Sequence, residues 1–426
     1  MSAAGPDTDA PPPPDPDVLI VGGGLAGLRA ARTLDAAGVD WALVEAGDAL
    51  GGRVRTDHVE GFALDRGFQV LLTAYPEARR ALDLDALDLH AFSPGALVRA
   101  DGAFHAVADP LRRPRAAWST LRAPVGTLAD KARLLQLRRQ VRRTEPLATP
   151  EQTTVADLEA TGFSPQMIAR FLRPLLAGIL LDPTLSTSNR MARFVLQMQF
   201  RGEVALPAGG MQALPDQLAA ALTRERVYLR TRVDALEGTT AHLRTGARVN
   251  ARRAVVVATE GPEAARLLDG AVADPGSRSV ACCYFAAETP PLGEPALVLN
   301  GEGRGPVTNL SELSAVAPGY APDGAALVSA AIVDDRGLEE ADLVAAVREQ
   351  LLGWFGARVR AWRHLATYRI AHAQPAQPVG WLSPPHRPVR LGAGRYVAGD
   401  HRDVASINGA LASGRRAADA VLADLP

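Results

Sequence analysis

Lysine is nearly absent from this sequence: of the 46 basic residues only Lys131 is lysine, and the rest are arginine. A lysine amine can form Schiff bases, and burial can turn it into a general base, whereas arginine stays protonated. Lysine-based catalysis is therefore excluded everywhere except at position 131.

Cysteine is also scarce. The two cysteines, Cys282 and Cys283, are adjacent in an apolar run, which argues against a disulfide framework and against a cysteine-rich metal site. We expect a protein without a metal centre, in a reducing, cytoplasmic setting.

Long apolar runs and an excess of one charge are missing as well. The best candidate for a membrane span, residues 171–181, is shorter than the ~18 apolar residues required and contains Arg173 and Pro174. The formal net charge of −1 gives no electrostatic reason to expect a nucleic-acid partner. Residues 1–16 lack the features of a secretion signal and are predicted to be a disordered tail. A chain of this length should form two intertwined domains, soluble or at most peripheral to a membrane.

A strand, a glycine turn and a helix are predicted near the N-terminus. Apolar residues 18–21 stop at a run of glycines, residues 25–34 have helical spacing, and a second apolar run, 41–44, ends in Glu45. Three glycines make the GxGxxG spacing of a dinucleotide site, and an acid near ~20 residues further on usually holds a ribose. These residues are Gly22, Gly24, Gly27 and Glu45.

Each glycine has a physical task in such a motif. Gly22 allows the tight turn, Gly24 lets backbone approach a pyrophosphate, and Gly27 lets helix and strand pack closely. The helix N-terminus, with Leu25 and Ala26, supplies N–H groups to the phosphates. The motif alone does not distinguish an NAD-binding site from an FAD-binding site.

The residues after the acid favour FAD. Residues 44–56 read VEAGDALGGRVRT and contain Gly51, Gly52 and Arg53. At this point the sequence resembles the superfamily of flavin amine oxidases, protoporphyrinogen oxidases and phytoene desaturases. The resemblance implies an α/β fold in which a Rossmann-type, glutathione-reductase-like FAD-binding domain is interleaved with an α+β substrate domain. It also implies that the GGR element follows the FAD diphosphate, with Arg53 meeting its charge.

A second block of resemblance lies at the C-terminal end. Residues 396–418, YVAGDHRDVASINGALASGRRAA, are similar to the closing motif of the superfamily. The resemblance implies that Gly399 and Asp400 meet the ribityl chain. Ile407 and Asn408 would begin a helix whose positive end faces the pyrimidine edge of the flavin. No cysteine lies near this motif, so we expect non-covalent FAD; a covalent link would point to His386 or His401.

Weaker resemblances lie between the two ends. Residues 207–214, PAGGMQAL, resemble the segment leading into the second FAD-binding part, and Val233 falls on the strand whose backbone meets adenine. Residues 65–69, DRGFQ, place Gly67 and Phe68 near the flavin ring, although core packing explains Phe68 equally well.

The blocks predict a division of the chain. The FAD-binding parts are 17–90, 201–270 and 391–426, a helical substrate cap spans 91–200, and a β-rich substrate part spans 271–390. Strand signals thin out across the cap, where residues 130–143 are predicted to be an exposed, charged helix.

The reaction requires few side chains, because a flavin carries the hydride chemistry. Tyr368 and His372, on a strand predicted to face the ring, and Gln69 are polar candidates for a catalytic role, with structural roles as the alternative. Flavin amine oxidases commonly use a lysine to orient a water, and Lys131 is predicted to lie elsewhere. We therefore predict dehydrogenation of a hydrophobic substrate of polyene or tetrapyrrole type, with oxygen or a quinone accepting the electrons. An amine oxidase, a redox-neutral flavin isomerase and a lipid-binding escort protein remain alternatives.

Each of two stretches of the cap has two possible interpretations. The many apolar residues of 163–181 line a substrate tunnel or fill a helical core. The ten positive residues of 112–143, against Asp130 alone, form a surface for anionic lipid or a solvated helix face.

Overall fold

The computed structural model describes residues 12–108 and 112–425. Most of the tail predicted at 1–16 lies outside the described residues. Its last residues are held in place, because Asp15 and Pro16 accept hydrogen bonds from the backbone N–H groups of Asn250 and Arg252.

A six-stranded sheet unites the two ends of the chain. Its order is β10 (Val227–Tyr228), β2 (Trp41–Val44), β1 (Val18–Val21), β14 (Ala254–Val257), β21 (Arg395–Val397) and β20 (Arg390–Gly392). All neighbours are parallel except β20, which runs antiparallel to β21. The strands β1, β2 and β14 are apolar at every position, as expected of a sheet covered on both faces.

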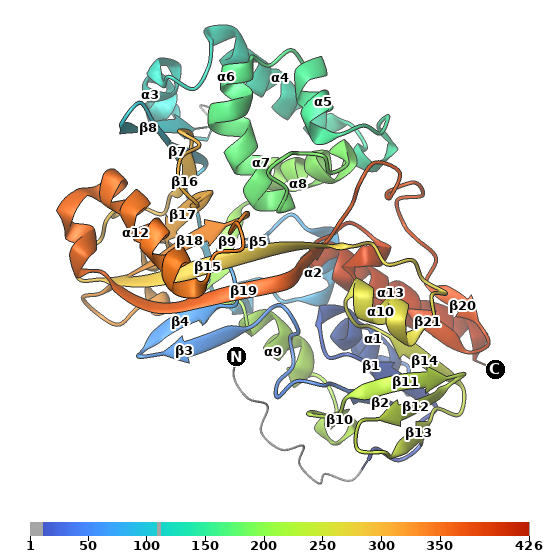
Figure 1. The fold of residues 1–426 in the computed structure, drawn as a ribbon. Helices are drawn as coiled ribbons and strands as arrows, with labels where there is room; N and C mark the ends of the chain where they lie inside the picture. The colour runs from blue at the N-terminus through green and yellow to red at the C-terminus, as the bar shows by residue number, and fades with distance from the viewer. Residues whose placement is uncertain (1–11, 109–111, 426) are drawn as a thin grey trace.

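Different elements cover the two faces of this sheet. Val18 and Ile20 pack with α1 (Leu25–Ala36) and α13 (Ile407–Asp424), whereas Leu19 and Val21 pack toward the small sheet β11–β12–β13 and α10 (Gly261–Leu267). The small sheet consists of β11 (Val233–Glu237), β12 (Thr240–Leu243) and β13 (Arg248–Asn250). Figure 1 shows α1 and α13, from opposite ends of the chain, side by side. The convergence predicted for the two terminal blocks is confirmed.

A second, seven-stranded sheet forms the other half of the molecule. Its order is β19 (Arg363–Pro375), β15 (Ser277–Ala287), β18 (Ala326–Ile332), β17 (Asn309–Glu312), β16 (Leu297–Asn300), β7 (Gly95–Ala100) and β8 (Ala103–Ala108). Helix α12 (Glu340–Phe355) packs on one face through an apolar cluster that includes Val347 and Phe285. The hairpin β7–β8 corrects the prediction that strands are lacking after residue 91: its pairing partner, β16, lies far along the chain and runs parallel to β7.

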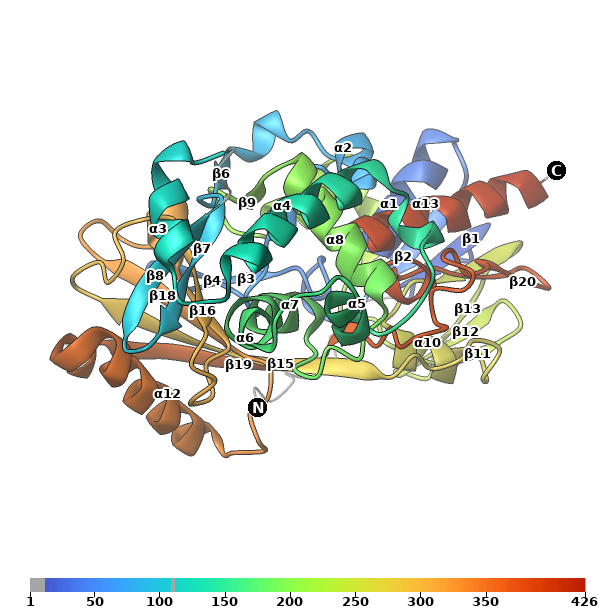
Figure 2. The ribbon, with the colours of Figure 1, turned by 90° about the horizontal axis from the view of Figure 1, so that it is seen from above.

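A group of helices lies over this sheet, at the top of Figure 1 and in the foreground of Figure 2. These helices are α3 (Ala117–Arg122), α4 (Leu128–Arg143), α5 (Thr154–Ala160), α6 (Pro165–Met167), a π-turn at Ile168–Leu172, α7 (Arg173–Leu180) and α8 (Asn189–Arg201). Helix α4 begins at a capping box in which Thr127 and Asp130 satisfy each other's backbone N–H groups. The helix predicted at 130–143 is thus confirmed.

Short elements link the two halves. They are β3 (Thr56–Val59), β4 (Phe62–Asp65), β5 (Leu71–Leu72), α2 (Pro76–Ala81), β6 (Leu89–Ala91), β9 (Val204–Pro207), α9 (Ala213–Ala220) and α11 (Leu313–Val316). No helix in the described part of the chain is both long enough and apolar enough to cross a bilayer.

Candidate cofactor and substrate site

One large cavity runs between the two halves of the molecule. Its volume is about 1270 Å³, more than the ~300–1,000 Å³ of a site for one drug-sized ligand. Glu45 from the N-terminal block and Asp400 from the C-terminal block both line it, as do helices of the cap. The cavity therefore has room for a long cofactor and a substrate end to end.

The glycine turn has the geometry that its motif predicts. Gly22 has a φ of +108°, and a Cβ there would lie 2.8 Å from the carbonyl oxygen of Ala258. A Cβ on Gly27 would lie 1.9 Å from the carbonyl oxygen of Gly22, so Gly27 serves packing and does not line the cavity. Gly24 is the N-cap of α1 and lines the cavity, and a Cβ on it would come no nearer to a neighbour than 4.0 Å, the distance to the Gly52 Cα. Its backbone, followed by Leu25 and Ala26, is open to a ligand.

Glu45 is fixed at the tip of β2 by two backbone donors. Its carboxylate accepts hydrogen bonds from the N–H groups of Gly23, at 2.6 Å, and Gly47, at 2.7 Å. These two bonds orient the carboxylate beside the N-terminus of α1, where it lines the cavity. The position suits an acceptor for ribose hydroxyls.

The GGR element connects the two terminal blocks. Gly51 and Gly52 have positive φ angles of +117° and +60°, and Gly51 donates to the carbonyl oxygen of Gly23. Arg53 pairs with Asp400 at 2.6 Å and donates to the carbonyl oxygen of Ala373 at 2.8 Å. Burial opposes the charge of Arg53, but the ion pair and hydrogen bond with Asp400 outweigh it and raise the pKa of Arg53. Sequence reasoning missed this ion pair.

The closing turn places the start of α13 at the cavity. Gly399, Asp400 and Ile407 line it, and Ser406 caps α13 by accepting from the Gly409 N–H. Asn408 behaves differently from the prediction, because its side-chain oxygen accepts from the Glu77 N–H and does not face the cavity.

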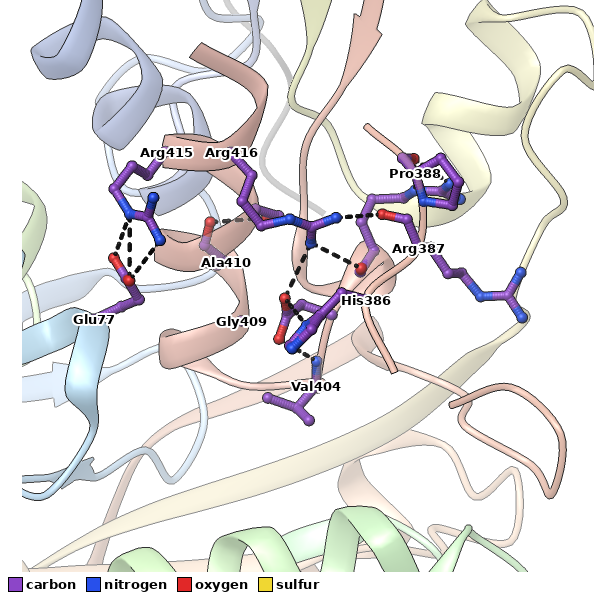
Figure 3. A network of polar contacts seen from close by, with 12 residues as sticks. Glu77, His386, Arg387, Pro388, Val404, Gly409, Ala410, Arg415 and Arg416 are labelled. Atoms are coloured by element: carbon purple, nitrogen blue, oxygen red, sulfur yellow. Dashed lines mark hydrogen bonds and ion pairs between the residues drawn. The ribbon is translucent and has the colours of Figure 1, made fainter. Parts of the chain in front are cut away.

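Two arginines brace α13 from opposite sides (Figure 3). Arg415 pairs with Glu77 of α2 at 2.9 Å, and Arg416 lies 3.2 Å from the buried carboxylate of Asp403, which also binds His386. The hydrogen bond between the His386 Nδ1 and the accepting carboxylate of Asp403 raises the pKa of His386. This network holds the turn before α13 in a fixed position.

Several other predicted residues also line the cavity. Gly67, Phe68, Gln69 and Val233 all line it. Phe68 also packs edge-on against Phe92, with ring centroids 6.2 Å apart. It therefore both lines the cavity and contributes to core packing, the two roles that the sequence left open. Gln69 donates to the carbonyl oxygens of Arg53 and Arg66, which gives its amide a structural task.

Tyr368 and His372 do not line the cavity, and the prediction that they face it is wrong. The Tyr368 hydroxyl donates to Asp57 at 2.8 Å, and the exposed His372 lies 2.8 Å from the Ser277 hydroxyl. Tyr368 pairs in regular register with Cys282, whereas the register shifts between Ile370 and Gln374, and His372 lies within that irregular stretch. The cavity is lined instead by Ile370, Ala373 and Gln374.

Residues 163–181 satisfy both interpretations that the sequence leaves open. One face lines the cavity, with Phe171, Leu172, Leu175, Ile179 and Leu181. The opposite face is fully packed and includes Met167, Leu176 and Leu180.

Lys131 is buried and lines the cavity, so the prediction of an exposed helix position is wrong. Its amine donates to the carbonyl oxygens of Leu121, at 2.6 Å, and Ala123, at 2.9 Å, at the end of α3. The last carbonyls of a helix need such donors. Burial lowers the pKa of Lys131.

Asn309 and Tyr75 are among the polar cavity residues that were not predicted. Asn309, on β17, is buried, and its side-chain oxygen has no hydrogen-bond partner among the described residues. Tyr75 stacks on Phe194 with ring centroids 6.0 Å apart, and burial raises the pKa of its hydroxyl. No local pattern marks either residue, because their neighbours come from distant segments.

Comparisons with known proteins agree with this architecture. The family model described as "Flavin containing amine oxidoreductase" matches residues 25–422. A coproporphyrinogen III oxidase of Mycobacterium tuberculosis is 31% identical over 278 residues, which are 59% of this chain and 60% of that protein. The chain thus matches less than two thirds of that relative's length.

Two further similarities cover almost the whole chain. A coproporphyrinogen III oxidase of Propionibacterium freudenreichii is 26% identical, with 92% of this chain and 89% of that protein covered. A solved structure of a putrescine oxidase double mutant superposes with a TM-score of 0.72 at 19% identity, covering 97% of this chain and 100% of that one. At that identity the superposition establishes the fold alone.

Proposed function

Because the chain belongs to the family of flavin-containing amine oxidoreductases, it is an FAD-dependent oxidoreductase, and we propose that it dehydrogenates a hydrophobic, acidic substrate of porphyrinogen type. Bound FAD supplies the hydride acceptor in such enzymes. The task of the protein is to bind both molecules, align them and exclude water.

The proposed FAD-binding residues follow the cavity from one terminal block to the other. Glu45 would hold the adenosine ribose, and the Val233 backbone would meet adenine. The open backbone at Gly24, Gly51 and Gly52, together with the N-terminus of α1, suits the diphosphate. Asp400 and the first turn of α13 would then meet the ribityl chain and the flavin ring.

Non-covalent attachment fits the lining of this cavity. Among the described residues, its lining includes no cysteine and no histidine. Both cysteines are buried in β15. Acid precipitation should therefore release the flavin, and flavin that stays on the chain would contradict this assignment.

The proposal for the substrate rests on the charge of the part of the cavity that the cap lines. We define the cap end as the cavity lining from residues 92–138 and 171–204. It is mostly apolar, and its charged side chains within the described chain, Arg112, Lys131 and Arg138, are all cationic. An alkyl amine is also a cation near neutral pH, since its pKa is about 10. Such a substrate would be repelled, whereas carboxylates on an apolar body would be attracted.

The two sequence relatives named above favour the same substrate class. Both are coproporphyrinogen III oxidases, and a porphyrinogen combines an apolar ring with carboxylate side chains; the putrescine oxidase, at 19% identity, shares the fold alone. A polyene would fit the apolar lining, but it carries no charge that the cationic side chains could attract. We propose oxygen as the electron acceptor, with a quinone as the alternative.

Anaerobic reduction of the bound flavin tests the proposal. We expect a porphyrinogen to bleach the flavin absorbance, and a polyene or a panel of amines to leave it unchanged. Bleaching by amines alone would establish the amine oxidase alternative. Conversion of a substrate only after prior reduction of the flavin, without net electron transfer, would establish an isomerase. Hydrogen peroxide on readmission of air identifies oxygen as acceptor, and a protein that binds no FAD would favour an escort role.

A further inference from the structure

Three large apolar side chains are exposed together at the cap. Trp118 and Leu121 on α3 are 62% and 46% exposed, and Leu128 at the start of α4 is 67% exposed. They are three of the five most exposed large hydrophobic residues in the described chain. We call these three residues the apolar mouth.

The apolar mouth lies where the cavity opens. Leu121 and Leu128 are exposed to solvent and also line the cavity. Both helices lie at the end of the molecule away from the six-stranded sheet, at the top of Figure 1. A molecule that leaves an apolar phase at this point would enter the cavity without crossing water.

The stretch that carries the apolar mouth is basic. Within residues 112–143 the exposed arginines are Arg112, Arg115, Arg122, Arg139, Arg142 and Arg143; Arg115 and Arg122 lie near the mouth in sequence, Arg112 is 3.9 Å from Glu203, and the last three lie toward the end of α4. The guanidinium of Arg122 lies over the Trp118 ring at 4.5 Å. The one acid in this stretch, Asp130, is buried, and hydrogen bonds from Ser164 and Thr127 outweigh its burial and lower its pKa to about 2. Since the chain as a whole has a net charge of −1, this basic excess is local.

We propose that the apolar mouth and its arginines dock on an anionic lipid bilayer, with α3 and the start of α4 at headgroup level. Tryptophan and leucine insert at such an interface while arginines meet the lipid phosphates. The three apolar side chains are too few for a stable protein interface, which buries about 800 Å² on each partner. Docking would let a hydrophobic substrate pass from lipid into the cavity, and this last step alone rests on the proposed function.

Vesicle flotation of the FAD-bound protein tests the docking without substrate or turnover. The probes are vesicles of phosphatidylcholine alone and of phosphatidylcholine mixed with phosphatidylglycerol. We expect the wild type to float with the mixed vesicles, to bind neutral vesicles less, and to be released as salt screens the charges. Failure of the substrate proposal would leave this result unchanged.

Paired variants identify the surface responsible. The double variant Leu121→Glu, Leu128→Glu should bind mixed vesicles at least about tenfold less, because two apolar side chains that would be buried in the bilayer are replaced by negatively charged ones. Arg115→Gln with Arg122→Gln should weaken binding and reduce its salt dependence. Val379→Glu is the matched control, since Val379 is also 46% exposed but lies outside the apolar mouth. Flavin absorbance of each variant confirms that it is folded.

Three results would overturn the proposal. The first is a wild type that floats with neither vesicle, and the second is apolar-mouth variants that bind like Val379→Glu. The third is that the wild type binds no vesicles but self-associates in analytical ultracentrifugation, and that the double variant abolishes this self-association. The apolar mouth would then be a contact between two copies of the chain. Equal binding to neutral and mixed vesicles would overturn the role of the arginines.

Discussion

At the scale of single residues, the carboxylates of the site have different tasks because they have different partners. Glu45 is held by two backbone N–H groups, and Asp400 is held by an arginine. Asp65 is buried among the Thr56 and Tyr320 hydroxyls and the Met211 N–H. The sequence marks Glu45 and Asp400 through their motifs, but it does not mark the task of Asp65, because two of its three partners come from distant segments.

Replacing Glu45 should weaken FAD binding. Hydrogen bonds to a charged group contribute about 1.5–3 kcal/mol each, so we expect Glu45→Ala to raise the Kd for FAD by roughly 10- to 100-fold. Titration of the apoprotein with FAD measures the change. Asp48→Ala is the control, since the exposed Asp48 pairs with Arg55 and is not among the described residues that line the cavity. Equal affinity of the Glu45 variant and the control would contradict the assigned role.

Asp65 should make stability depend on pH. Burial raises the pKa of Asp65 to about 6, although its hydrogen bonds act in the opposite direction. Because the folded-state pKa lies above the unfolded value, the protonated carboxyl stabilises the fold at low pH. This stabilisation is lost as the pH rises from about 4 to about 6, by up to about 3 kcal/mol. Denaturant unfolding across this range measures the loss. The variant Asp65→Asn should remove this component of the pH dependence, and an unchanged profile would exclude Asp65 as its source.

At the scale of elements, local sequence signals predicted individual helices and strands well. The pairing of strands from distant segments could not be predicted from them. The unit of β1, α1 and β2 follows from apolar runs around a glycine turn, and α4 follows from helical spacing. The hairpin β7–β8 was missed although its two-residue turn, Asp101–Gly102 with φ angles of +50° and +77°, is a local signal; only its place beside β16 depends on a distant segment. The direction of the His372 side chain was wrongly predicted because the register shift around it depends on the pairing of β19 with β15.

Two helical glycines should respond differently to replacement by alanine, because Gly27 of α1 contacts the glycine turn and Gly353 of α12 does not. A Cβ on Gly27 would lie 1.9 Å from the carbonyl oxygen of Gly22, whereas a Cβ on Gly353 of α12 meets nothing within 4 Å. We expect Gly27→Ala to destabilise the protein by at least about 1–3 kcal/mol, as overpacking does. Gly353→Ala should stabilise it by about 0.5–1 kcal/mol, because alanine favours helix over glycine. Thermal unfolding compares the two, and equal shifts in Tm would show that α1 can move away from the turn.

At the scale of the whole molecule, the site joins segments that lie at opposite ends of the chain. The ion pair between Arg53 and Asp400 spans 347 positions in sequence. The motifs at both ends predicted one shared cofactor site. They could not predict the charge of the cap end, because Arg112, Lys131 and Arg138 have no motif and meet only in the folded chain.

Removal of FAD should therefore lower the stability of both halves of the molecule together. The part of the cavity proposed for FAD is lined by residues at the six-stranded sheet, such as Glu45 and Asp400, and by Ala373 and Gln374 of β19 in the seven-stranded sheet, so bound FAD would contact both halves. Free FAD at about 1,000 times its Kd adds about 4 kcal/mol to the folded state. Calorimetry should show one transition for the FAD-bound protein, moving to higher temperature as FAD is added in excess, and a lower Tm for the apoprotein. If only one of two transitions moved, FAD would be held by one half alone, and the end-to-end site argued from Glu45 and Asp400 would be wrong.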